Sequence, residues 1–493
     1  MIMKILNQLD KIRGAGLLII VFAYTPGVFK ESFWSDDYVA LMDTQGLANH
    51  LLKDGRPTAA VLLSSSFSLI KDPANSWILR ALALVTLLSI FLFITKQING
   101  ARHRDIGTIS IAIAFCLPSF QMYIHWSTTW FYLLAVVAGL YAFHFWSSKL
   151  ASKKILALVL LVLALTTYPP AALFFFAVIA ITNLVNESKC YRFFVDAIQG
   201  IILLSISGMV SILVVFFTME IANVSPNSRV AIVPLSGIPE KIIWLFSRPF
   251  VISLRPFMID SPTVSMALFT SMPVLLILIF GLKQQSNKLG ESFLYKSALV
   301  AALLLLSLAP IIVASDNQIE FRVIPGLTWG IAVLATYFLL VMISSWLNPL
   351  AVNLKLKRMP LLVATLVLAF VGIGSINAHY ADLFSGPYQK KNTFLTARIS
   401  SCFDSRSINN IVIIPPKLPF PTLQRLGVFS MSTDLASGWV PKPNVELLLR
   451  RIDTDVPVEY LATRPLDTKI TETECVIDLE EFRELLTHIP PKE

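Results

Sequence analysis

Residues 155–186 read ILALVLLVLALTTYPPAALFFFAVIAITNLVN and contain no Asp, Glu, Lys or Arg. Runs of about 20 apolar residues are long enough to cross a bilayer as helices. This run is interrupted at Tyr168, because a residue that precedes proline disfavours the helical conformation. We therefore expect two short membrane segments, or one re-entrant hairpin, that meet at Tyr168.

The chain up to about residue 380 has the same apolar character. Of the 493 residues, 55% are hydrophobic and 14% are charged, and the mean hydropathy is +0.69. Soluble domains carry about 25% charged residues, and disordered chains are poor in hydrophobic ones. The composition excludes both classes and predicts an all-α polytopic membrane protein. Its eleven candidate transmembrane helices are centred roughly on residues 14–30, 76–95, 106–123, 128–146, 155–168, 171–186, 197–219, 264–282, 297–315, 323–344 and 360–378.

Basic residues predict how these segments are oriented. Alternate loops carry 17 Lys and Arg residues, and the loops between them carry far fewer. The positive-inside rule places the basic loops in the cytoplasm. The amino terminus is then cytoplasmic, and the first segment is an uncleaved anchor because it lacks a small-x-small cleavage site. The outer side receives three loops and the tail, which are residues 31–75, 220–262, 316–322 and 381–493.

Residues 1–380 are thus predicted to form the membrane domain, and residues 381–493 a small domain on the outer side. Short apolar runs at 411–414 and 475–477 predict strands, and residues 445–451 predict a helix between them. The tail is therefore expected to be a small α/β domain.

Two of the four cysteines, Cys402 and Cys475, lie in this tail. An oxidising outer compartment permits a disulfide between them. Two separate buried thiols are the alternative.

The first outer loop contains the adjacent carboxylates Asp36 and Asp37, a few residues beyond the first segment. Burial and a like-charged neighbour both raise a carboxylate pKa, so either group is a candidate general base. Alternatively, the carboxylates cap a helix that begins there. Both roles are compatible if one carboxylate caps and the other reacts.

Three arginines near the outer boundary are candidates for binding a phosphate. Arg56 lies in the Gly-Arg-Pro turn before the second segment, Arg322 ends a short polar loop, and Arg255 lies in the 220–262 loop. A guanidinium binds phosphate through two parallel hydrogen bonds. The alternative role for each is a structural anchor at the interface. Candidate substrate-binding side chains are Tyr38, Asp54, Tyr168 and Glu320.

Other kinds of site have little support in the sequence. The six His residues do not combine with Cys or carboxylates at zinc-ligand spacing, so no metal site is predicted. A carboxylate site could bind a divalent cation, but no spacing indicates one. No Walker loop and no basic stripe interleaved with aromatic residues is present, so neither nucleotide nor nucleic-acid binding is indicated.

The Ser-Asp-Asp-Tyr motif at 35–38, Gly-Arg-Pro at 55–57, the break at Tyr168 and the position of Arg322 together resemble the GtrII-type glucosyltransferases of O-antigen serotype conversion. The resemblance covers about residues 10–380. It implies a GT-C fold whose active site faces the periplasm of the bacterial inner membrane. It also implies glucose transfer from undecaprenyl-phosphate-glucose to a sugar of lipid-linked O-antigen, with a flippase and a lipid-charging glucosyltransferase in the same pathway.

The resemblance assigns roles to these residues. Asp36 is expected to take the proton of the acceptor hydroxyl, and Asp37 to orient that base or the acceptor. Arg322 is the first candidate to compensate the charge of the departing phosphate, and Arg56 and Arg255 are the next candidates. A single displacement of this kind inverts the anomeric centre.

Two other kinds of function remain open from the sequence. A lipid-linked-sugar flippase or transporter usually places its polar groups near the middle of the bilayer. Here the ionisable residues gather at the outer boundary instead. An O-antigen polymerase or ligase would use the same compartment, but the Asp pair directly after the first segment favours the transferase.

Overall fold

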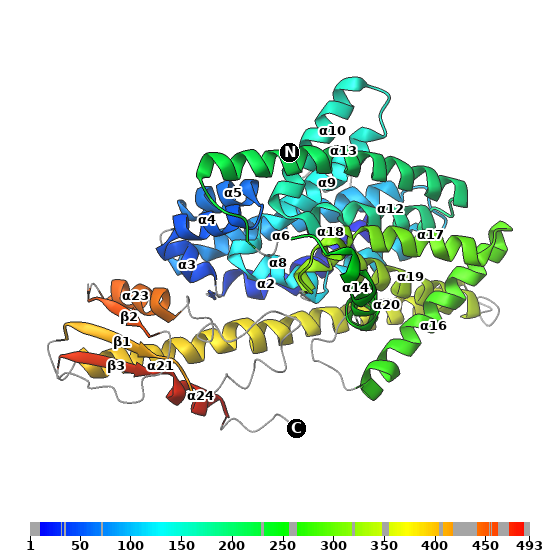
Figure 1. Cartoon of the computed structure of the whole chain (residues 1–493). Coiled ribbons are helices and arrows are strands. Elements are labelled where there is room, and N and C mark those ends of the chain that lie inside the picture. The colour runs from blue at the N-terminus through cyan, green and yellow to red at the C-terminus, as the bar shows by residue number, and fades with distance from the viewer. Residues whose placement is uncertain are drawn as a thin grey trace.

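A computed structural model describes residues 10–30, 32–33, 36–70, 72–227, 231–255, 264–317, 321–347, 354–403, 408–417, 441–452, 454, 456–461 and 473–487. They form a large helical body, from which the successive helices α20 and α21 run out to a small three-stranded sheet (Figure 1).

The helical body begins with helices around the first outer loop. These are α2 (Lys11–Phe29), α3 (Asp36–Met42), α4 (Thr44–Lys53), α5 (Pro57–Phe67), η1 (Pro73–Ser76), α6 (Trp77–Gln97), α7 (Arg104–Ala114), α8 (Pro118–His125), η2 (Ser127–Thr129) and α9 (Tyr132–Trp146). The second half contains α10 (Ala151–Thr167), α11 (Pro169–Ala172), α12 (Phe174–Val185), α13 (Cys190–Ala222), η4 (Leu235–Gly237), α14 (Ile238–Ser247), α15 (Pro249–Ser253), α16 (Val264–Leu289), α17 (Phe293–Leu306), α18 (Ala309–Val313), η5 (Phe321–Val323), α19 (Pro325–Leu347) and α20 (Leu354–His379).

Several of these helices are suited to cross a membrane. Six helical segments are long and apolar enough, or seven if the pair α7–α8, bent by 57°, forms one span. The protein is therefore a mainly α-helical, membrane-embedded protein. The six segments are Lys11–Phe29, Pro73–Gln97, Ser127–Trp146, Cys190–Ala222, Pro325–Trp346 and Leu362–Phe403.

The count differs from the eleven segments expected, although each expected segment lies on a helix or a pair of helices. Part of the difference comes from broken or short helices. Helix α10 has 17 residues, which span roughly 25 Å at 1.5 Å per residue, against roughly 30 Å for a bilayer core. The break expected at Tyr168 is present, since this residue has extended backbone angles between α10 and α11.

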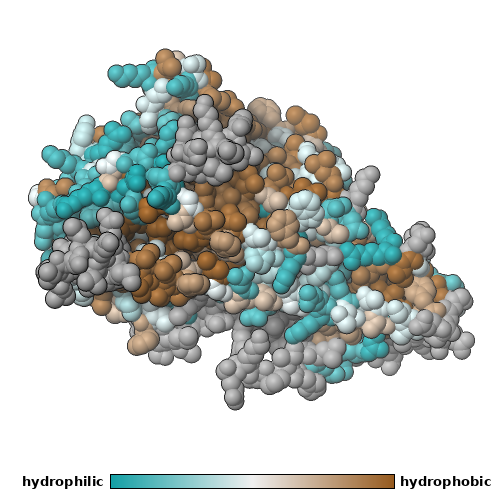
Figure 2. Space-filling view, turned by 180° about the vertical axis from the view of Figure 1, so that it is seen from behind, coloured by the Kyte–Doolittle hydropathy of each residue, from teal (hydrophilic) through white to brown (hydrophobic). Residues whose placement is uncertain are grey.

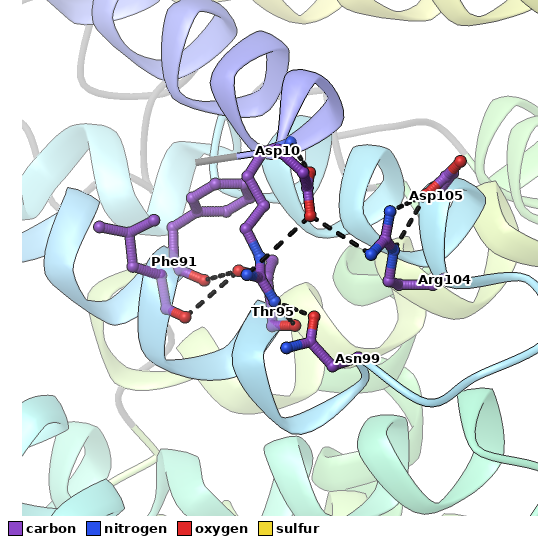
Figure 3. Close-up of polar contacts among 8 residues, drawn as sticks. Asp10, Phe91, Thr95, Asn99, Arg104 and Asp105 are labelled. Carbon is purple, nitrogen blue, oxygen red and sulfur yellow. Dashed lines mark hydrogen bonds and ion pairs between the residues drawn. The ribbon is translucent and has the colours of Figure 1, made fainter. Parts of the chain in front are cut away.

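We call the end of the body that holds the 98–103 loop the inner end, because the basic loops predict that it faces the cytoplasm. Here Asp10 caps α2 by accepting the backbone N–H of Arg13 at 2.9 Å. Arg104 of α7 lies 3.3 Å from the same carboxylate and also pairs with Asp105 (Figure 3). Arg13 donates to the carbonyl of Thr95 on α6 at 2.9 Å. These contacts tie the inner ends of three helices together.

The outside of the body is largely apolar. Seen from behind, a broad hydrophobic area is bordered by hydrophilic residues (Figure 2). Large apolar side chains are also exposed along α13, α16 and α20, as expected of helices that face lipid. Examples are Ile212, Phe216, Phe269, Phe280 and Phe370.

The tail is joined to the body without a break in the helical chain. The π-helix η6 (Tyr380–Ser385) directly follows α20, and α21 (Gly386–Phe403) continues from it. The expected boundary at residue 380 thus falls within one helical stretch. The hydrophobic cluster of the body includes Tyr388 and also Leu447, and a second hydrophobic cluster begins at Phe394.

The second cluster contains a small parallel sheet. The order is β2–β1–β3, formed by β1 (Asn410–Ile414), β2 (Val458–Tyr460) and β3 (Glu474–Asp478). Helices α21, α23 (Pro441–Arg451) and α24 (Leu479–Thr487) pack around it. The strands expected at 411–414 and 475–477 and the helix expected at 445–451 are all present, whereas β2 was not anticipated.

A disulfide joins Cys402 at the end of α21 to Cys475 on β3. It closes a loop with a sequence separation of 73 residues. Of the two alternatives left open by the sequence, the structure thus contains the bridge. The other two cysteines, Cys116 and Cys190, are buried and free.

Candidate functional site

The Asp-Asp pair lies at the start of α3, and its two carboxylates have different surroundings. Asp37 is fully buried and accepts the backbone N–H groups of Ser127 and Thr128 at 3.3 and 2.8 Å. It therefore fixes the turn η2. Asp36 is only partly buried and is the first residue of α3. The arrangement leaves Asp37 as the positioning carboxylate and Asp36 as the more accessible one.

Arg56 follows a turn that local geometry dictates. Gly55 has a φ of +73°, which glycine adopts without strain, and Pro57 begins α5 at a position where a missing N–H costs nothing. The turn directs the guanidinium of Arg56 over the ring of Tyr168, 5.1 Å from its centre. The break at Tyr168 thus supplies the surface on which Arg56 rests.

Arg322 reaches the same region from η5. Its guanidinium lies 4.7 Å from the centre of the Trp126 ring, and its carbonyl accepts the hydroxyl hydrogen of Tyr123 at 2.6 Å. Tyr123 in turn packs edge-on against Tyr168, with ring centres 6.4 Å apart. The rings therefore connect Arg322 to the surface under Arg56.

The electrostatic state of Arg56 reflects this proximity. Burial lowers its pKa, but Tyr132, Tyr168 and Asp54 raise it by more, so the net pKa lies above the usual value. The positive charge of Arg322 acts in the opposite direction. The two guanidinium groups thus share one electrostatic environment. An anion bound between them would offset their repulsion.

Three tyrosine rings pack against one another in this region. Tyr132 and Tyr168 lie parallel, with ring centres 3.8 Å apart and an interplanar angle of 6°. Tyr123 meets Tyr132 edge-on at 5.8 Å. The three packed rings therefore support Arg56 through Tyr168, and Tyr123 also bonds to the backbone carbonyl of Arg322. Tyr168 was anticipated, but Tyr123 and Tyr132 were not.

The tail also contributes to this region. Lys391 of α21 is 3% exposed, and its ammonium group donates to the hydroxyl of Tyr38 at 2.8 Å. Helix α23 packs against α3, the helix that begins at Asp36. The outer domain is thus in direct contact with the Asp-Asp-Tyr motif.

A second unanticipated cation is Arg80 of α6, which is fully buried. It donates to the hydroxyls of Ser32 and Ser76, the latter at 3.0 Å. Its positive charge also interacts with the carboxylate of Asp37. A charge inside an apolar segment is costly. Arg80 lies in the first turn of α6, where these hydroxyls accept its hydrogen bonds.

Of the remaining predicted residues, Asp54 lies close enough to Arg56 for its charge to raise the pKa of that arginine, whereas no contact links Arg255 to this centre among the described residues. Asp54 is buried, accepts the side-chain amide of Asn227 at 2.8 Å and lies 3.7 Å from His50. Arg255 is 3% exposed and donates to the hydroxyl of Thr270 at 2.9 Å. Glu320 lies outside the described residues.

We refer to the region defined by residues 36–38, 56, 126, 168 and 322 as the outer site. It combines a partly buried carboxylate with two arginines held on aromatic rings. Across the part of the chain that the structure describes, no group of three or more His, Cys, Asp or Glu side chains is arranged to hold a metal ion.

Comparisons with known proteins give no further assignment. No protein-family model matches the chain, and none of the curated proteins matches it either.

Proposed function

We propose that the protein is a polytopic glycosyltransferase of the bacterial inner membrane. It would move glucose from undecaprenyl-phosphate-glucose to a sugar of lipid-linked O-antigen on the periplasmic side. The observation that carries the proposal is the pair of arginines, Arg56 and Arg322, held over Tyr168 and Trp126. Asp37, the residue after Asp36, accepts the backbone N–H of Ser127, the residue after Trp126. Paired guanidinium groups suit a lipid-linked phosphate, and a nearby carboxylate suits the activation of a hydroxyl.

The proposed reaction is a single displacement. Asp36 accepts the proton of the acceptor hydroxyl while that oxygen forms a bond to the anomeric carbon. The bond from this carbon to the phosphate oxygen breaks, and its electron pair leaves with undecaprenyl phosphate. Arg322 and Arg56 compensate the developing negative charge. Attack from the face opposite the phosphate inverts the anomeric centre.

The proposal includes the GT-C fold and eleven spans. The bent pair α7–α8 would count as one span, and α10, α11–α12, α16 and α17–α18 would complete the set. The amino terminus would be cytoplasmic and the disulfide-bonded tail periplasmic. A flippase and a lipid-charging glucosyltransferase would supply the donor.

The test is the structure of the O-antigen in a host that makes both substrates and contains the flippase and the charging enzyme. Mass spectrometry and NMR would compare cells with the wild-type chain, with no chain and with Asp36→Asn. We expect one added hexose per repeat with the wild type and none with the variant.

Asp43→Asn is the matched control. Asp43 is exposed and caps α4 by accepting the N–H of Gly46 at 2.8 Å, a bond that asparagine can also accept. This variant should modify the O-antigen like the wild type. An unmodified O-antigen with the wild-type chain, while undecaprenyl-phosphate-glucose is present outside, would refute the proposed donor and acceptor.

A further inference from the structure

The segment at residues 126–128 contains polar side-chain atoms that the fold leaves without partners. The indole nitrogen of Trp126, the hydroxyl of Ser127 and the hydroxyl of Thr128 are buried, and within the described part of the chain none of them forms a hydrogen bond. The three residues are 3%, 0% and 5% exposed. Leaving a buried polar atom unpaired is unfavourable, because the atom gives up its hydrogen bonds to water and gains none in return. Three such atoms in consecutive residues therefore need an explanation.

This segment contacts two parts of the outer site, the Asp-Asp pair and Arg322. Asp37 accepts the backbone N–H groups of Ser127 and Thr128, at 3.3 and 2.8 Å. Arg322 lies over the ring of Trp126 at 4.7 Å. The unpaired atoms are thus adjacent to both the carboxylate pair and an arginine assigned to the phosphate.

The neighbouring His125 also has both ring nitrogens unpaired, but its environment is different. Its ring packs against Tyr24, Tyr380 and Phe384, with ring centres 5.6, 4.6 and 5.3 Å away. This aromatic packing accounts for the position of the ring, so His125 is not included in the site proposed next.

We propose that Trp126, Ser127 and Thr128 form a sugar-binding subsite, which holds the hydroxyl groups of the hexosyl unit attached to the donor phosphate. This inference rests on the proposed function. An indole N–H only donates, whereas a serine or threonine hydroxyl both donates and accepts. A hexose presents several hydroxyls that do both, so it can satisfy all three atoms at once. The phosphate on Arg322 would bring the attached sugar next to Trp126.

All three atoms are buried, so a sugar can reach them only after neighbouring side chains move. Binding of the sugar is therefore coupled to a local rearrangement, a common feature of sites that exclude water before reaction. The energy lost by leaving three polar atoms unpaired is recovered when the sugar binds.

Serine at position 127 has a matched counterpart far along the chain. Ser207 of α13 is likewise 0% exposed, and its hydroxyl is likewise unpaired among the described residues. Removing an unpaired buried hydroxyl should not destabilise the fold. Ser127→Ala and Ser207→Ala should therefore both unfold at or above the wild-type temperature. Only Ser127→Ala should alter recognition of the sugar.

The experiment measures binding of two probes, undecaprenyl phosphate and undecaprenyl-phosphate-glucose, to the purified full-length protein in detergent. Wild type should prefer the glucosylated lipid. Ser127→Ala and Thr128→Val should each reduce that preference about tenfold, the effect of losing roughly one hydrogen bond to the ligand. Both variants should bind undecaprenyl phosphate normally, and Ser207→Ala should match the wild type for both lipids.

Three results would be adverse, and they are distinguishable. A wild type that binds both lipids equally, or variants that keep the full preference for the glucosylated lipid, would overturn the subsite alone. A wild type that binds neither lipid would overturn the proposed function together with the subsite.

Discussion

The two ends of the helical body differ in the contacts of their principal cations. Each end also has an example of the other kind, since Lys296 lies 5.7 Å from the centre of the Phe193 ring and Arg451 pairs with Asp72. At the inner end, cations pair with carboxylates of the same helix, of another helix or of a loop, which offsets both charges. At the outer end, cations lie over aromatic rings, which attract a cation without neutralising it. The inner pairs are Arg104–Asp10, Lys288–Glu187, Lys296–Glu291 and Arg192–Asp196. The outer contacts are Arg56–Tyr168, Arg322–Trp126 and Lys391–Tyr38.

The contrast suggests different tasks for the two ends. Neutralised pairs stabilise helix packing and leave little net field for a ligand. A contact with a ring does not neutralise a cation, so the positive charge can still attract an anion. The inner end is thus interpreted as structural and the outer end as the binding site, and substitutions at the two ends should affect stability and activity differently.

The largest expected effect concerns the tail, which brings Lys391 to the outer site. Replacing Cys402 and Cys475 by serine removes a crosslink that should stabilise the tail by roughly 4 kcal/mol in the loop-entropy description. We expect the double variant to expose the tail to limited proteolysis at lower temperature than the wild type. Equal protease resistance of variant and wild type would show that the disulfide does not stabilise this domain.

A substitution at the inner end should affect stability and spare recognition. Lys296 is fully buried and lies 3.1 Å from Glu291. Lys296→Met would leave that carboxylate without its cation, at a cost of about 3 kcal/mol. The thermal unfolding temperature in detergent should fall, and the double variant with Glu291→Gln should recover much of the loss. Lipid binding by the folded fraction should remain normal. A loss of binding would break the distinction between the two ends.

The reverse pattern is expected at the outer end. Arg322→Ala should slow transfer about 100-fold, the effect of removing one donor from a developing negative charge. Thermal stability should change little. Arg322→Lys should recover only part of the rate, because lysine lacks the planar pair of donors. The exposed Arg248 on the 220–262 loop supplies the control, and Arg248→Ala should behave like the wild type. An unchanged rate and donor KM in Arg322→Ala would remove the phosphate role.

The smallest expected effect is a pH dependence at the inner end. Burial raises the pKa of Glu291, but hydrogen bonds from the backbone of Cys190 and from Lys296 lower it by more. The net pKa therefore lies below the usual value. The folded state therefore binds this proton less readily than the unfolded state. The resulting stabilisation is complete above about pH 4.3, the ordinary glutamate pKa, and is lost as the pH falls through the lower folded value.

The measurement compares thermal unfolding of the wild type and Glu291→Gln as the solution is acidified. Their difference in stability should shrink below about pH 4.3. A difference that stays constant across this range would mean that the carboxylate is not stabilised in its charged form.

Local sequence patterns predicted those features of the fold that depend on neighbouring residues. The proline after Tyr168 sets the break, and Gly55 with Pro57 sets the turn that carries Arg56. The apolar runs at 411–414 and 475–477 became strands of the tail for the same reason. These features need only the backbone preferences of a few adjacent residues.

Contacts between segments that are distant in the sequence could not be predicted from local patterns. Lys391 approaches Tyr38 across 353 positions, and Asp37 caps a turn 90 positions away. Such pairs depend on how whole helices pack, which no local pattern specifies. Arg80 was missed because an isolated charge in an apolar run gives no sign of the serines that satisfy it.

The most direct test of the outer site is an experimental structure of the full chain with undecaprenyl-phosphate-glucose in a lipid nanodisc. We predict that the donor phosphate lies within hydrogen-bonding distance of the guanidinium groups of Arg56 and Arg322, with the glucosyl unit near Asp36. A donor bound with its phosphate away from both arginines would contradict the assignment of the outer site.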